Sequence, residues 1–164
     1  MVTIAAICRE AQTVQPGRGQ PQPFLADGPL RAVLDLSAVS AAPGRARAWT
    51  RQVLWEWPLT GLADNAELVV SELVTNSVLA SRWQAWAAIR LTLICDRQQL
   101  VVLVRDSDPR TPARRHADAD DVSGRGLLLV ESLSDRFGWY LAADGAPGKV
   151  VWAVLSVPPS SRMS

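Results

Sequence analysis

An apolar segment from Leu62 to Ala80 constrains this chain most, because its periodicity predicts one long helix packed on a core. Its apolar stripe consists of Leu62, Ala66, Val69, Leu73, Ser77 and Ala80, widened by Val70 and Val74. A helix turns 100° per residue, so Glu72 and Asn76 lie one turn apart at the rim of this stripe. The wheel places the other polar residues on the opposite, solvated face, namely Asp64, Glu67, Ser71 and Thr75. An acid and an amide at the rim of a core need partners, which a metal–phosphate group could supply. The same spacing also occurs by chance in helices that bind nothing.

A second acid, Asp106, follows an apolar run, 100–105, that reads as a buried strand. Alternation places Asp106 on the same face as Leu100, Val102 and Val104. A carboxylate on an inward face must accept hydrogen bonds, although Asp106 could also simply cap the turn before Pro109.

A third feature is the run Ser123-Gly124-Arg125-Gly126, which leads into an apolar helix. Backbone N–H groups at such a start bind anions, and the alternative is an ordinary helix-entry turn.

The remaining patterns predict the order β-α-α-β-β-α-β-β, with strands at 31–36, 88–95, 100–105, 137–141 and 149–157. Helices are predicted from Pro43 to Trp55, over the segment described above with Thr60 as its cap, and at 126–133. This order predicts an α/β sandwich, with helices on one face of a mostly antiparallel sheet. Residues 1–29 are expected to form a poorly ordered arm, 30–157 the folded domain and 158–164 a frayed tail.

Composition and charge argue against some classes of partner. The 164 residues are 48% hydrophobic with a net charge of +1, which indicates one soluble domain and argues against nucleic acid or anionic membrane as the main partner. Cys8 and Cys95 lie in unlike contexts, so a reducing cytoplasm is expected. No stretch approaches the length of a membrane span.

The order and spacing of these motifs resemble the nucleotide site of the Bergerat-fold ATPases, which include gyrase, heat-shock chaperone ATPases, sensor histidine kinases and mismatch-repair ATPases. The chain is most similar to small actinobacterial ATP-binding regulators related to anti-sigma-factor serine kinases. Their Ser-Glu-Leu-Val-x-Asn helix motif matches 71–76, and their strand ending in aspartate matches Asp106. Their Gly-Arg-Gly-Leu turn matches 124–127, and their Gly-Lys before an apolar strand with Trp matches 148–152.

The resemblance implies a role for each matching residue. Asn76 would bind Mg²⁺ that bridges the phosphates of ATP, and Glu72 would orient or deprotonate the attacking nucleophile. Asp106, with Ser107 beside it, would accept a hydrogen bond from the adenine amino group. The phosphates would be wrapped by the turn of Gly124, Arg125, Gly126 and Leu127. Lys149 would be a further contact to the nucleotide, or else a solvated lysine at a strand edge.

The chain also departs from the family pattern. Relatives often have Ala-x-x-His after the asparagine, where this chain has Ser77 to Ala80. They also have Asp-x-Gly at the base, where this chain has Asp106-Ser107-Asp108. The following segment could be a lid or merely a charged loop, and its cations are Arg110, Arg114, Arg115 and His116. His116 stands alone, which supports neither a metal site nor a phospho-accepting histidine.

By resemblance, the chain would bind ATP and Mg²⁺, phosphorylate a serine on a small antagonist protein and sequester a sigma factor, with a homodimer also possible. The alternative is a non-catalytic switch that binds a partner with or without nucleotide. Several of the seven tryptophans are expected to anchor the core. If Trp83 and Trp86 are exposed, they would mark a protein-binding surface.

Overall fold

A computed structural model describes residues 29–84, 86–96, 98–110, 112, 125–143 and 145–159. The elements are β1 (Leu30–Ser37), α2 (Ala42–Glu56), the 3₁₀ turn η1 (Thr60–Leu62), α3 (Ala63–Ser81), β2 (Ala88–Cys95), β3 (Gln99–Asp106), α4 (Gly126–Leu133), β4 (Arg136–Leu141) and β5 (Lys149–Ser156). This order confirms the predicted one. The expectations for the terminal arm through residue 28, for Gly124, Arg114, Arg115 and His116, and for the tail from 160 lie outside the described residues.

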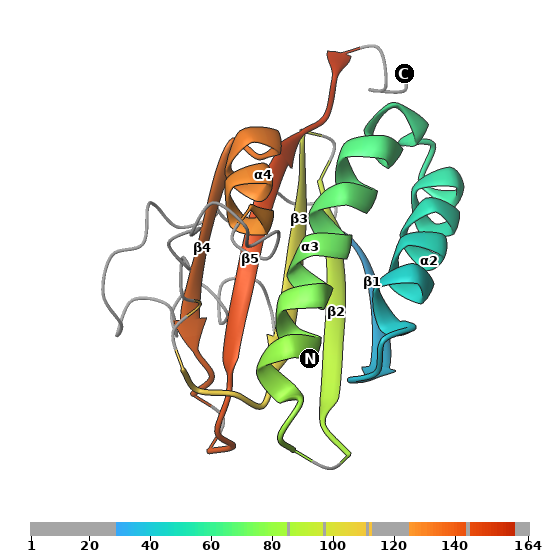
Figure 1. Ribbon diagram of the computed structural model, residues 1–164. Helices are drawn as coiled ribbons and strands as arrows, with labels where there is room; N and C mark the ends of the chain where they lie inside the picture. The colour runs from blue at the N-terminus through green and yellow to red at the C-terminus, as the bar shows by residue number, and fades with distance from the viewer. Residues whose placement is uncertain are drawn as a thin grey trace.

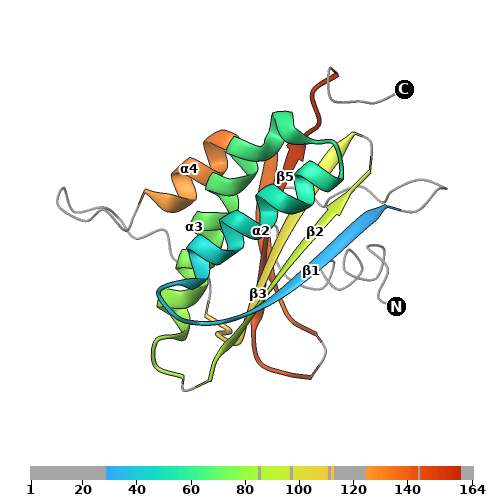
Figure 2. The same ribbon diagram turned by 90° about the vertical axis from the view of Figure 1, so that its right-hand side faces the viewer.

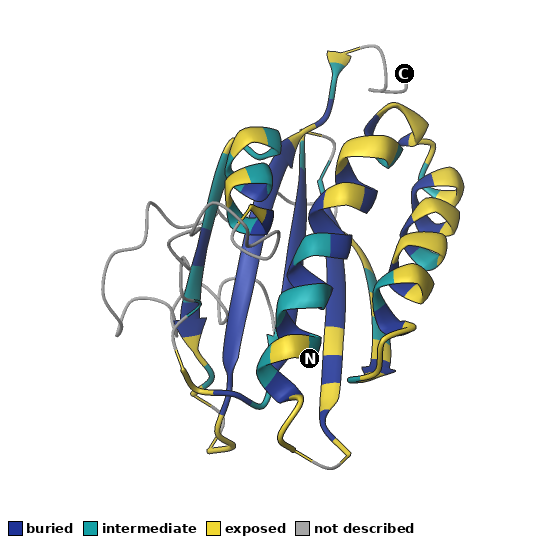
Figure 3. Ribbon diagram, in the orientation of Figure 1, coloured by how far each residue is buried: buried dark blue, intermediate teal, exposed yellow. Residues whose placement is uncertain are grey.

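The strands form one antiparallel sheet in the order β1-β2-β3-β5-β4. Figures 1 and 2 show α2, α3 and α4 on a single face of this sheet, which confirms the predicted two-layer sandwich. The core between the layers contains Leu100, Val102 and Val104 of β3, as the alternation predicts. Val101 and Leu103 of the same strand belong to a second buried cluster on the other face. Strands β3 and β5 are therefore buried along almost their whole length (Figure 3).

The environment of α3 differs from the prediction at Glu67 and Ser71, which are buried instead of solvated. The reason is that α2 packs beside α3 and covers this face. The guanidinium of Arg51 donates two hydrogen bonds to the Glu67 carboxylate, at 2.6 and 2.9 Å. Arg47 Nη1 donates to Ser71 Oγ at 2.9 Å. Polar residues on α3 are thus held by arginines of α2.

The predicted cap of α3 is also wrong. Thr60 begins the 3₁₀ turn, and Leu62 occupies the N-cap position without a side-chain hydrogen bond. The chain enters α3 directly from that turn, because Leu62 already has α-helical backbone angles and is buried in the core. This end of α3 therefore continues from the 3₁₀ turn without a polar side-chain cap.

Two hairpins complete the sheet. Between β2 and β3, the Asp96 carboxylate accepts hydrogen bonds from the backbone N–H groups of Gln98 and Gln99, both at 2.7 Å. This turn confirms the predicted hairpin. After β4 the chain returns through Gly145, at φ +82°, and β5 inserts between β3 and β4. No helix in the described part of the chain is long and apolar enough to span a membrane.

Candidate functional site

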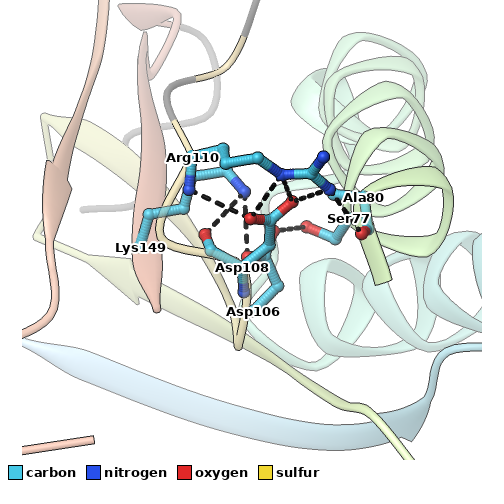
Figure 4. Close-up of polar contacts among 6 residues, drawn as sticks. All are labelled: Ser77, Ala80, Asp106, Asp108, Arg110 and Lys149. Atoms are coloured by element: carbon cyan, nitrogen blue, oxygen red, sulfur yellow. Dashed lines mark hydrogen bonds and ion pairs between the residues drawn. The ribbon is translucent and has the colours of Figure 1, made fainter. Parts of the chain in front are cut away.

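Asp106 is the centre of a buried polar cluster where β3 ends against α3 (Figure 4). Only 2% of the residue is exposed, on the inward face that the sequence predicts. Ser77 Oγ of α3 donates to Asp106 Oδ2 at 2.8 Å, and the backbone N–H of Asp108 donates to Oδ1 at 3.0 Å. Lys149 Nζ also donates to Oδ1, at 2.9 Å. The hydrogen-bond donors that burial of a carboxylate requires are therefore all present.

Lys149 begins β5 and lies directly across from Asp106 in the β3–β5 register. It is 4% exposed, and its ammonium also donates to the carbonyl of Asp108 at 3.0 Å. The reading as a solvated strand-edge lysine does not hold, because β5 lies between two other strands of the sheet. Its positive charge therefore pairs with the Asp106 carboxylate, and its second hydrogen bond holds the loop after β3.

The start of β5 approaches β3 closely because residue 148 is glycine. Gly148 has φ +152°, and a Cβ at this position would overlap the backbone carbonyl oxygen of Asp106. A side chain there would push the strand away from the cluster. Gly148 thus allows Lys149 to reach Asp106.

Asp108 and Arg110 extend the cluster towards the end of α3. Arg110 Nε and Nη2 both bond to the Asp108 carboxylate, with the shortest contact at 2.7 Å, and the Arg110 backbone N–H donates to the same carboxylate at 3.0 Å. The Arg110 side-chain hydrogen bond holds the pKa of Asp108 below its ordinary value, against the opposing effect of burial. Arg110 Nη2 also donates to the carbonyl of Ala80 at 3.3 Å. Arg110, predicted as a lid or loop cation, therefore bonds both to the loop after β3 and to α3.

The side chain of Glu72, a residue of α3, lies against Gly126 at the start of α4. A Cβ added to Gly126 would collide with Glu72 Oε2, so the glycine leaves the space that this carboxylate occupies. Arg125, the N-cap of α4, makes no side-chain cap, and the helix's N–H to C=O bonding begins only when Leu129 donates to Arg125. The N–H groups of 126–128 therefore have no partner within the helix. Such a helix start attracts negative charge.

One side of α3 thus brings together motifs that are far apart in sequence. Glu72 meets α4, half-buried Asn76 follows one turn later, and Ser77 contacts Asp106. Among the other predicted site residues, Ser107 and Leu127 are half-buried, and Arg125 is exposed. Within the described ranges, no group of three or more His, Cys, Asp or Glu side chains gathers to hold a metal ion.

Sequence reasoning missed Ser77 as a partner of Asp106, because a serine within an apolar stripe is readily taken as core. The available signal was a hydroxyl in that stripe together with an acid on the inward face of a strand. The paired roles of Asp108 and Arg110 were missed too, since a loop arginine gives no sign of its partner.

A family model described as "Histidine kinase-like ATPase domain" matches residues 34–155. This range runs from β1 into β5 and contains every residue of the site described above. No curated protein matches the chain.

Proposed function

Because this chain belongs to the histidine kinase-like ATPase domain family, we propose that it is an ATP-binding regulatory protein. The site lies along α3, between the start of α4 and the place where the end of β3 meets the start of β5. The observation that carries this proposal is the contact of α3 with both elements, through Glu72 at Gly126 and through Ser77 at Asp106.

The residues at Asp106 fit an adenine base. An ionised carboxylate offers about four acceptor positions, and three are used by Ser77, Lys149 and the N–H of Asp108. The remaining position is on Oδ2. It would accept a hydrogen bond from an exocyclic amino group such as that of adenine. An acceptor-only group rejects a carbonyl at that position of the base.

The start of α4 fits phosphate groups. Its first three N–H groups, which have no partner within the helix, and the exposed Arg125 provide hydrogen bonds and positive charge. The carboxamide oxygen of Asn76 would bind Mg²⁺, which neutralises phosphate charge when bound. Mg²⁺ typically takes few protein ligands and keeps several waters, which suits a single amide ligand.

The finer proposal is a serine/threonine protein kinase of the anti-sigma-factor type. The half-buried carboxylate of Glu72 would orient the hydroxyl of a partner's serine and accept its proton, while the γ-phosphoryl group moves from ATP to that oxygen and ADP leaves. The sigma factor and antagonist protein implied by the resemblance would be its partners.

The tryptophans support a partner surface. Trp83 and Trp86, in the turn after α3, are 77% and 99% exposed, and the Arg82 guanidinium lies 5.0 Å from the Trp83 ring centroid. Trp86 also has a positive φ of +64°, which is unusual for a bulky residue. Large aromatic side chains held in water contribute little to the fold and are favoured at binding hot spots. We assign the partner contact to this turn.

A non-catalytic switch is the second candidate. It is favoured by Asp108, which stands where relatives have glycine and forms a closed pair with Arg110. Phosphate transfer to a candidate antagonist protein separates the two, because a switch shows none. In a kinase, Glu72→Gln should keep ATP binding and lose transfer.

Calorimetric titration of Mg²⁺-ATP tests the site itself. Wild type should bind, Asn76→Ala should lose at least about tenfold in affinity, and Asn65→Ala should match wild type, because Asn65 is exposed on the first turn of α3. Absence of wild-type binding at millimolar ATP would contradict the proposal. Equal affinity in all three proteins would contradict the role of Asn76.

A further inference from the structure

Asp106 is covered on the side of α3 by contacts between that helix and the segment after β3. Two cross-links join α3 to the segment that begins at the end of β3, namely Ser77 to Asp106 and Ala80 to Arg110. Ser77 and Ala80 are three residues apart and therefore lie on neighbouring positions of one helix face. In Figure 4 the Arg110 side chain extends across to Ala80 beside the Asp106–Ser77 contact. Asp106 and Asp108 are left only 2% and 4% exposed.

The two partners of the Asp108–Arg110 pair differ in freedom. The Asp108 side chain is 6% exposed, whereas the Arg110 side chain is 70% exposed. Asp108 is also tied to Asp106 through its N–H and to Lys149 through its carbonyl. The exposed Arg110 side chain can therefore give up its 3.3 Å contact with the Ala80 carbonyl at small cost while it stays paired with Asp108, which itself stays in place.

We infer that Arg110, held by Asp108, is a gate over the base site, which opens when Arg110 leaves the Ala80 carbonyl and admits the nucleotide base to Asp106. The inference rests on the proposed ATP binding. In this role Arg110 controls how fast nucleotide enters the site and takes no part in the chemical step. Asp108, at the position where relatives have glycine, is what keeps the gate closed.

A matched ion pair provides the control. Arg51 and Glu67 form the same kind of two-point contact between α2 and α3, with side chains 67% and 11% exposed, but they hold no group of the Asp106 cluster. Double variants are needed in both places, because removing one partner alone leaves a buried carboxylate without its cation. The comparison is therefore Asp108→Ala/Arg110→Ala against Arg51→Ala/Glu67→Ala.

Stopped-flow mixing with Mg²⁺ and a methylanthraniloyl-labelled ATP measures the association rate constant. Loss of one charged, hydrogen-bonded pair shifts an equilibrium by roughly 5- to 30-fold, so the gate variant should bind faster by roughly that factor. The control variant should bind at the wild-type rate. A structural role alone would slow or weaken binding in both variants through loss of stability.

A second readout follows the gate directly. The Nε–H resonance of Arg110, identified by its loss in Arg110→Lys, should shift when Mg²⁺-ATP saturates the protein, and that of Arg51 should not. Equal association rates in wild type and gate variant, or an unchanged Arg110 resonance at saturation, would overturn the gate and leave ATP binding intact. Absence of binding in every protein would overturn the proposed function and the gate together.

Discussion

The contribution of an ion pair to the free energy of unfolding depends on its surroundings, and two ion pairs of this chain can be compared. Lys149 and Asp106 are both buried and 2.9 Å apart, whereas Arg90 and Asp35 pair on an exposed part of β1 and β2 with side chains 55% and 61% exposed. Arg90 still holds the pKa of Asp35 below its ordinary value, mainly through their hydrogen bond. Water screens that attraction, while Asp106 has no such screening.

We expect Lys149→Met to lower the free energy of unfolding by about 3–5 kcal/mol, because it leaves a buried carboxylate without its cation. Arg90→Met should cost about 0.2–1 kcal/mol. Urea titrations of both variants at neutral pH measure the difference. Similar losses in the two proteins would show that Asp106 gains its stability from Ser77 and the Asp108 N–H alone.

Gly126 gives a second prediction for a single residue. Gly126→Ala places a methyl group where the Glu72 carboxylate lies, so the start of α4, which is proposed to bind the phosphates, must move away from α3 and Mg²⁺-ATP affinity should fall by about tenfold or more. Gly44→Ala is the matched control, since it also adds a methyl group near the start of a helix, where the nearest atom is Arg47 Nη2 at 3.8 Å. It should keep its affinity and gain about 0.5–1 kcal/mol in stability. Calorimetric titration measures both affinities and urea unfolding measures the stability of Gly44→Ala; equal affinity in the two variants would contradict phosphate binding at the start of α4.

Among the elements, the contact between α2 and α3 relies on small residues. Ala46 of α2 and Ala66 of α3 are fully buried, whereas Ala48 of α2 is exposed. Ala46→Leu should therefore destabilise the protein by about 1–3 kcal/mol through overpacking, with Ala48→Leu close to neutral. Thermal unfolding of both proteins gives the answer. A neutral Ala46→Leu would mean that α2 can shift away from the core without loss.

Local sequence patterns predicted most elements to within a residue or two. The helix at 126–133 was predicted with the bounds observed for α4, because a glycine turn and an apolar run define both its ends. The burial of Glu67 and Ser71 was not predictable, because it depends on where α2 packs. The same limit applies to Lys149, since the insertion of β5 between β3 and β4 is a property of the whole sheet.

For the site, the sequence predicted which segments meet but not how their side chains pair. Asp106 was placed on the correct face by alternation alone. Its partner Ser77 and the Asp108–Arg110 pair depend on the distance between α3 and the end of β3. Sequence periodicity shows which face of an element a residue lies on, but it does not show how far apart two elements pack.

For the whole molecule, nucleotide binding should appear as resistance to heat, because a ligand that binds only the folded state stabilises it. At a hundredfold excess of free Mg²⁺-ATP over its dissociation constant, the gain is about 2.7 kcal/mol, or a rise in Tm of roughly 5–10 °C for a chain of this size. Asn76→Ala, with at least tenfold weaker affinity, should gain about 1.4 kcal/mol or less at the same concentration and so show about half of this rise or less, and Asn65→Ala should show all of it. Scanning calorimetry measures all three proteins, and an equal rise in each would place binding away from Asn76.

The position of β5 has a consequence for how the protein is made. A ribosome releases β3 and β4 before β5, yet both pair with β5 and not with each other. Until β5 emerges, the nascent chain exposes an unpaired edge of β3, and Asp106 has no lysine to neutralise it. Because the same strand completes both the sheet and the proposed site, a chain without β5 would not bind nucleotide. Binding competence would therefore arise late in synthesis, at the moment when the aggregation-prone edge is covered.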